Sequence, residues 1–399
     1  MEAAGFYRLC PLPGGEGMRP MLKALCLGWV TDMLKVILAL RGTGIDTVVV
    51  NTHPDRFFAT VPALAANIPV ALNLYQGVRV PKLKLTRFLL IANTCALGSS
   101  LSRRLRALIR SHQPDFAFAH WGVGMLPEVA LVKSVAPELP IILNMETFPT
   151  APEGGLREAL EQKMFRRMHW ALDGLIIPTA EMAQLVFSLA PSLRKKPYWV
   201  SPFYYPKEFA PARALPKLRA KDSRPHVIFA GQFDLRHSIN DVRKEILSLA
   251  EVGIVVHCAA TAGLEHPNVV KFDPFGGEEL VSGFLTTFMT QFDACLVTYA
   301  ELRCTPMRFS TSLPSRFLIA LAAGLPMLLP GGRFGAMERF IKEQGIGFVY
   351  RDPFEAYEFL TSTVTLPRLE AISRTKASQF ILQPKELSGF IERVIKCRA

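Results

Sequence analysis

The stretch LPSRFLIALAAGLPMLL, residues 313–329, decides the fold class of this chain. Its apolar middle has the length of a short helix, Gly324 and Pro326 end that helix, and the run at 327–329 has the length of a strand. Short β-branched runs alternate with longer helical patterns in the same way along the whole sequence. This alternation is typical of βαβ units, so we expect an α/β protein with parallel sheets.

The alternation falls into two halves. In the first half we expect strands at 6–10, 47–51, 70–73, 116–120, 141–145 and 175–178. In the second half we expect strands at 227–229, 254–258, 269–272, 294–297, 327–329 and 347–350. Residues 191–223 between them are rich in proline and basic residues, as a linker is. Because 399 residues exceed one hydrophobic core, we predict domains over 1–204 and 205–380, and a C-terminal helix over 381–399 that packs back toward the first domain.

The beginning of the chain allows two interpretations. In the first, residues 6–10 form a strand, the loop PLPGGEG follows at 11–17, and a long helix ends at Gly42. In the second, the first strand is 22–27 and it leads into a helix over 31–41. We expect the first, in which Gly15 and its neighbours face a ligand cleft.

The formal net charge of +12 favours a polyanionic partner. The basic residues are not interleaved with aromatic ones, and no nucleic-acid-binding module is recognisable, so a phosphorylated ligand and anionic lipid fit better than nucleic acid. Residues 82–110 mix basic and apolar side chains. They predict either a surface that docks on anionic lipid or a core helix with a solvated basic face.

The cysteines and the apolar stretches indicate the compartment. Seven cysteines are scattered without a CxxC spacing, which predicts neither a disulfide framework nor a zinc site. The first twenty residues lack the pattern of a signal peptide, and no apolar stretch reaches the roughly 20 residues of a membrane span. We therefore expect a cytoplasmic protein, or one held peripherally on the cytosolic face of the inner membrane.

Several segments resemble GT-B glycosyltransferases. In the second half these are VIFAG at 227–231, HPNVV at 266–270, FDACLVTY at 292–299, LPSRFLIALAAGLP at 313–326 and GIGF at 345–348. In the first half they are QPDFAFAHW at 113–121 and PIILNME at 140–146. Their order along the chain is that of the family. Residues 299–326 are most similar to the bacterial glucuronosyltransferases of exopolysaccharide assembly.

This resemblance implies the fold and the reaction. It implies two Rossmann-like parallel-sheet domains facing a central cleft, with the acceptor on the first domain and the nucleotide sugar on the second. The reaction would move a sugar from a nucleotide diphosphate donor, most simply a UDP-sugar, to a glycan or lipid-linked acceptor in cell-surface polysaccharide synthesis. No other cofactor is implied, and no DxD-type metal motif stands out.

Arg316 is the first candidate for donor binding. It lies one turn into the helix that begins near Ser312, where free backbone N–H groups and the helix dipole attract anions. Its guanidinium suits a diphosphate, and the family usually has a lysine at this position. Three residues later the family has a glutamate that holds the donor ribose, whereas this chain has Ile319.

Further donor-side candidates lie near the same helix and at the first strand of the second half. Gly231 allows close approach of a phosphate. The remaining donor candidates are Arg236, Tyr299, Glu301 and Ser312. Each also has an ordinary interpretation, as a surface charge or a strand-end residue.

Glu146 is the candidate for chemistry. It follows an apolar strand, where related inverting enzymes place a general base, and it would act best if burial raised its pKa toward neutrality. A carboxylate that caps a helix or pairs with a lysine is the alternative interpretation. On the acceptor side we add Gly15 and the strand-end His120.

Two other functions remain open. A non-catalytic GT-B-like binding subunit would explain Ile319. A sugar-nucleotide epimerase would need several carboxylates in the cleft, for which only Glu146 and Glu301 are candidates. The fold alone does not choose among these functions.

Overall fold

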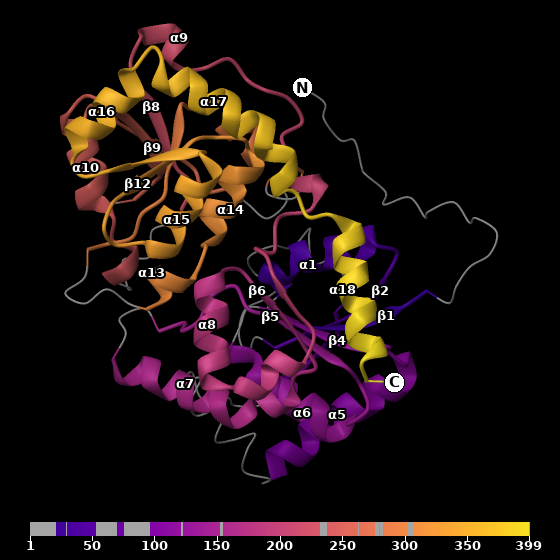
Figure 1. Ribbon diagram of the computed structural model, residues 1–399. Coiled ribbons are helices and arrows are strands. Elements are labelled where there is room, and N and C mark those ends of the chain that lie inside the picture. Colours follow the sequence, from indigo (N-terminus) through magenta and orange to yellow (C-terminus); the bar gives the residue numbers. More distant parts are fainter. Residues whose placement is uncertain are drawn as a thin grey trace.

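The structure of the chain is a computed structural model. It describes residues 21–28, 30–52, 70–75, 96–120, 123–151, 155–231, 238–261, 263–275, 279, 282–301 and 307–398. Two parallel β-sheets with helices on both faces form the two halves of the molecule (Figure 1).

The first sheet has seven strands in the order β3-β2-β1-β4-β5-β6-β7. The strands are β1 (Lys23–Gly28), β2 (Asp46–Asn51), β3 (Val70–Asn73), β4 (Phe116–His120), β5 (Ile141–Asn144), β6 (Gly174–Ile177) and β7 (Tyr198–Val200). One face packs on α5 (Ala96–His112), α6 (Leu126–Val135), α7 (Leu156–Met168) and α8 (Ala180–Leu189). The other face packs on α1 (Val30–Gly42) and α18 (Pro384–Lys396).

The second sheet has six parallel strands in the order β10-β9-β8-β11-β12-β13. The strands are β8 (His226–Phe229), β9 (Val255–Ala259), β10 (Val269–Phe272), β11 (Ala294–Leu296), β12 (Met327–Pro330) and β13 (Gly347–Tyr350). Its helices are α9 (Arg219–Asp222), α10 (Arg243–Glu251), α12 (Phe284–Met289), α13 (Arg308–Thr311), α14 (Ser315–Ala322), α15 (Gly335–Gln344), α16 (Pro353–Thr361) and α17 (Thr365–Lys376). The predicted fold class, two Rossmann-like parallel-sheet domains, is confirmed.

The long helix that was expected to end at Gly42 is wrong in its first part. Strand β1 occupies Lys23–Gly28, inside the long helix that the preferred interpretation placed there, and α1 begins only at Val30. β1 is the third of seven strands, between β2 and β4, and its side chains from Ala24 to Leu27 are fully buried. Burial on both faces turns a central parallel strand into a continuous apolar run, which a buried helix resembles. The segment 6–10 and Gly15 lie outside the described residues.

Strand β7 was also missed. Tyr198–Val200 lies within the stretch interpreted as a linker, yet it pairs with β6 at the edge of the first sheet. Tyr198 and Val200 are exposed, so this short strand lacks the buried alternation that makes others recognisable.

Helix α5 shows the predicted amphipathic pattern. Leu101, Leu105 and Leu108 are buried, whereas Arg103 and Arg106 are exposed. The basic face of this helix is therefore solvated, and its apolar stripe belongs to the core of the first half. Residues 82–95 lie outside the described part of the chain.

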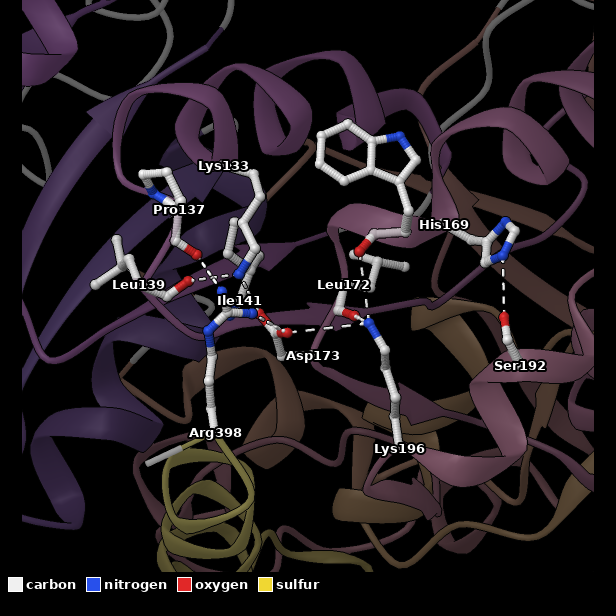
Figure 2. Close-up of polar contacts among 11 residues, drawn as sticks. Lys133, Pro137, Leu139, Ile141, His169, Leu172, Asp173, Ser192, Lys196 and Arg398 are labelled. Atoms are coloured by element: carbon white, nitrogen blue, oxygen red, sulfur yellow. Dashed lines mark hydrogen bonds and ion pairs between the residues drawn. The ribbon is translucent and has the colours of Figure 1, made fainter.

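Helix α18 runs back to the first sheet after the chain has completed the second one (Figure 1). Leu387, Phe390, Ile391 and Val394 of this helix are buried in the core beside α1. Just beyond its end, Arg398 Nη1 donates to Asp173 Oδ1 at 2.6 Å (Figure 2). Lys133 donates to the other carboxylate oxygen at 2.6 Å, so Asp173 joins α6, the start of β6 and the C-terminal segment.

None of the described helices is both long and apolar enough to cross a membrane. The described cysteines in the sheets are small buried residues. Burial raises the pKa of Cys26 and of Cys295 to about 12, which keeps both thiols protonated.

Candidate functional site

A pocket of about 190 Å³ lies at the carboxyl ends of the strands of the second sheet. Ala230 and Gly231 follow β8, Ala259 ends β9, and the first turn of α14 contributes Ser315 and Arg316. Ligands of open parallel sheets bind at this edge, where loops from neighbouring strands converge. The remaining lining residues are Tyr205, Phe272, Pro274, Phe275, Leu285 and Ile319.

Arg316 is the cation of this pocket. Its Nη1 donates to the carbonyl oxygen of Thr298 at 3.1 Å, and its guanidinium lies 4.5 Å from the ring centre of Tyr299 and 5.0 Å from that of Phe229. The two aromatic rings and the carbonyl oxygen fix the orientation of the Arg316 guanidinium. A guanidinium has five N–H donors, so others remain for an anion.

Gly231 lies directly beside the Arg316 guanidinium, where there is no room for a side chain. A Cβ atom at position 231 would lie 2.8 Å from Arg316 Nη1 and 2.6 Å from the Phe229 ring. Any larger residue would displace either the guanidinium or the ring. That Gly231 allows close approach of a phosphate stays a prediction; in the structure the groups next to Gly231 are the Arg316 guanidinium and the Phe229 ring.

Three other donor-side candidates, Tyr299, Ser312 and Glu301, are not among the described residues that line the pocket. Tyr299 is only 7% exposed, and its ring stacks on that of Phe309 with 4.9 Å between ring centres. The same ring contacts the Arg316 guanidinium. Ser312 is buried next to the Thr311 hydroxyl. Glu301 is exposed and pairs with Lys244 at 3.2 Å. Arg236 lies outside the described residues.

Glu146 lies on the first domain, two residues after β5 ends, and is buried. Its Oε1 accepts a hydrogen bond from Lys35 Nζ of α1, and Lys35 is 6% exposed. Asn144 Nδ2 donates to His120 Nδ1 at 2.9 Å, so the neutral ring carries its proton on Nε2, which faces Glu146 Oε1 at 4.0 Å. Four polar side chains therefore meet at the carboxyl ends of β4 and β5.

Lys35 is the member of this group that sequence reasoning missed. Its ammonium lies 5.1 Å from the ring centre of Tyr205 and 5.8 Å from that of Phe203. Tyr205 also lines the pocket, so a single ring lies between the buried ion pair and the pocket of the second domain. Lysines in amphipathic helices usually face solvent, and the prediction also misplaced the start of α1, so no signal marked Lys35 as a site residue.

The two domains are tied together beside the site by α13. Thr311 Oγ1 donates to the carbonyl oxygen of Phe148 at 2.7 Å, and Thr179 Oγ1 donates to the carbonyl oxygen of Thr311 at 2.5 Å. Arg308 Nη1 donates to the carbonyl oxygen of Thr150 at 3.1 Å. The segment 308–312 therefore links the loop after β5, which carries Glu146, to the helix that carries Arg316.

We expect Thr311→Val to reduce the free energy of unfolding by about 1–3 kcal/mol, because the buried Phe148 carbonyl would lose its donor. Urea denaturation measures the change. Thr361→Val is the matched control, since that hydroxyl bonds only carbonyls of its own exposed helix end, and it should shift stability by less than about 0.5 kcal/mol. Equal effects of the two substitutions would show that the interdomain hydrogen bond adds nothing.

Within the described residues, no group of three or more His, Cys, Asp or Glu side chains is arranged to hold a metal ion. The described lining of the pocket offers instead one arginine, one helix N-terminus and a mostly apolar wall. Such an arrangement can bind an anionic group without a metal.

No family model matches the sequence, and no curated protein matches it. Solved structures do match it. Sucrose-phosphate synthase from Thermosynechococcus elongatus has 11% identity and a TM-score of 0.65, over 94% of this chain and 100% of that chain. HepE from Anabaena, solved in complex with UDP, has 11% identity and a TM-score of 0.60, over 94% and 100%.

A UDP-N-acetylglucosamine 2-epimerase is also similar, with 14% identity and a TM-score of 0.52, over 91% of this chain and 94% of that chain. At these identities the likeness establishes the fold. Both parallel sheets are covered in a single superposition, because each match spans more than nine tenths of the chain. The chain therefore has the GT-B fold, and its structural neighbours include GT-B glycosyltransferases.

Proposed function

We propose that this protein is a glycosyltransferase that moves a sugar from a nucleoside diphosphate to an acceptor hydroxyl. The observation that carries the proposal is the placement of Arg316 and Glu146. Arg316 lies in a pocket at a helix N-terminus, and the buried Glu146–Lys35 pair lies on the other domain across the ring of Tyr205. Arg316 can stabilise the charge of a leaving diphosphate, and Glu146 can accept the proton that an acceptor hydroxyl must lose.

The donor in this proposal is a pyrimidine nucleoside diphosphate sugar. HepE was solved with UDP, and a spinosyn rhamnosyltransferase with a TM-score of 0.50 was solved with thymidine diphosphate. Both ligands carry a diphosphate that Arg316 and the first turn of α14 can bind. A thermal-shift panel of UDP, dTDP, GDP and CMP tests the proposal, and a flat panel, repeated with intact nucleotide sugars, would contradict it.

We expect Arg316→Ala to weaken binding of UDP or dTDP about 10- to 100-fold, because a hydrogen bond to a charged group contributes about 1.5–3 kcal/mol. Isothermal titration calorimetry measures this change. Arg351→Ala is the control, since Arg351 is an exposed arginine of the same domain that pairs with Glu355. Unchanged nucleotide affinity in Arg316→Ala would contradict phosphate binding at this site.

The acceptor side of the proposal is a glycan or lipid-linked sugar of cell-surface polysaccharide synthesis, with the protein held peripherally at the cytosolic face of the membrane. The support is the net charge of +12 and the exposed Arg103, Arg106 and Arg110 on α5, since each cation near an anionic surface contributes about 1 kcal/mol. Sedimentation with phosphatidylglycerol vesicles tests this, with phosphatidylcholine vesicles as the control.

An epimerase is the second candidate, because an epimerase shares the fold at a TM-score of 0.52. An epimerase converts its nucleotide sugar without an acceptor, whereas a transferase releases the nucleoside diphosphate. Chromatography of a nucleotide sugar incubated with the protein separates these outcomes. Nucleotide binding without either product would indicate a non-catalytic binding subunit.

A further inference from the structure

Tyr205 contacts both halves of the candidate site. It is half-buried, and it lines the pocket of the second domain together with Arg316. The centre of its ring also lies 5.1 Å from Nζ of Lys35, the lysine that donates a hydrogen bond to the buried Glu146. One side chain therefore touches the pocket of the second domain and the ion pair of the first.

The chain crosses between the domains at this residue. Phe203 is 2% exposed in the core beside α1 and α18, where its ring lies 6.0 Å from that of Phe118 on β4. Two residues later, the ring of Tyr205 lies 4.8 Å from that of Phe209, which is buried in the core of the second domain. The chain crosses back at the same place, because Leu382 N donates to the carbonyl oxygen of Tyr205 at 3.0 Å just before α18 begins. Tyr205 thus lies where the two crossings meet.

The contact between Lys35 and Tyr205 joins a buried cation to the wall of the pocket. Lys35 is 6% exposed, and its Nζ lies 5.8 Å from the ring centre of Phe203 as well as 5.1 Å from that of Tyr205. A cation and an aromatic ring attract each other, and more strongly where water is excluded. This attraction holds the Tyr205 ring toward the first domain and the ammonium beside Glu146. A ligand that fills the pocket packs against the same ring, so the position of the ring affects the ligand and the ion pair alike.

We propose that Tyr205 is a positioning residue that couples occupation of the pocket to the Glu146–Lys35 pair; the inference rests on the proposed function. A nucleoside diphosphate in the pocket confines the Tyr205 ring, and the confined ring holds Lys35 and through it the carboxylate. A coupling between two sites is reciprocal in binding free energy. Loss of Lys35 therefore weakens nucleotide binding, although Lys35 is not among the described residues that line the pocket.

The test is a double-mutant cycle on the affinity for UDP or dTDP, whichever binds in the thermal-shift panel, measured by calorimetry. We expect Lys35→Met to weaken nucleotide binding about threefold to tenfold when Tyr205 is present, the size of a desolvated cation–ring contact. In the Tyr205→Leu protein the same change should alter affinity by less than about 1.5-fold, because no ring transmits the loss. Tyr205→Phe keeps the ring and should restore the full effect of Lys35→Met.

Phe275→Leu is the matched control for the loss of a ring. Phe275 also lines the pocket, but it packs on the rings of Phe272 and Phe288 in its own domain. Whatever Phe275→Leu does to affinity by itself, Lys35→Met should still weaken binding in that protein as it does in the wild type. The variant Lys35→Met/Glu146→Gln repeats the cycle without an unpaired buried charge, so the test does not depend on the stability of Lys35→Met.

The outcomes separate this inference from the proposed function. If Lys35→Met weakens binding equally with and without the Tyr205 ring, or not at all, the coupling is overturned and the glycosyltransferase proposal stands. If the cycle shows the coupling but no nucleoside diphosphate is released from a nucleotide sugar, the coupling holds and the transferase proposal fails. If no nucleotide binds, both proposals fail.

Discussion

Glu146→Gln should lower kcat about 100- to 10,000-fold and leave nucleotide affinity near the wild-type value. Glutamine keeps the shape of the side chain but cannot accept the acceptor proton, and general-base catalysis contributes a factor of this size. Glu146 lies on the first domain, two residues after β5, whereas the residues that can bind the diphosphate belong to α14. The substitution therefore separates chemistry from donor binding.

The measurement is release of the nucleoside diphosphate from the nucleotide sugar that the binding panel selects, together with calorimetry of the free nucleotide. Glu138→Gln is the matched control, because Glu138 is an exposed carboxylate of the same domain. A Glu146→Gln variant that turns over at the wild-type rate would exclude Glu146 as an essential base. A loss of nucleotide affinity instead of kcat would assign Glu146 to donor binding.

The sequence predicted the fold more completely than the site, because strands are local patterns and sites are not. The predicted strands at 116–120 and 347–350 match β4 and β13 residue for residue. A short apolar run between two turns is enough to identify such a strand from the sequence. The sequence predicts a helix where β1 lies, because an apolar run that is buried on both faces lacks the alternation of apolar and polar residues that marks a strand.

The site depends on contacts that no local pattern encodes. Arg316 was recognisable from its place near a helix start, and the structure puts it in the pocket. Tyr299 ends the segment 292–299 and Ser312 precedes the segment 313–326, but both side chains are buried. Lys35 and Tyr205 are 170 positions apart and meet only because the chain crosses between the domains at the end of the first sheet. Tertiary structure alone brings such pairs together.

Lys35 is the buried partner of Glu146. Two interpretations of Glu146 were open from the sequence: a base whose pKa burial raises, or a carboxylate that caps a helix or pairs with a lysine. The structure pairs this carboxylate with a lysine that is itself 6% exposed, and a nearby cation stabilises the ionised form. Lys35 therefore fixes the position of the carboxylate at the end of β5 through the hydrogen bond that it donates to Glu146 Oε1.

Lys35→Met should therefore reduce the free energy of unfolding by about 3–5 kcal/mol, the usual cost of leaving one member of a buried pair alone. The double variant Lys35→Met/Glu146→Gln should recover most of that loss, because it removes both charges together. Urea denaturation of the four proteins gives the coupling, and Lys385→Met, at an exposed position of α18, should change stability by less than about 0.5 kcal/mol. If the two single effects simply add, the pair is uncoupled and Lys35 does not hold the carboxylate. If they couple and kcat of Lys35→Met falls as it does in Glu146→Gln, Lys35 is a positioning residue for the base.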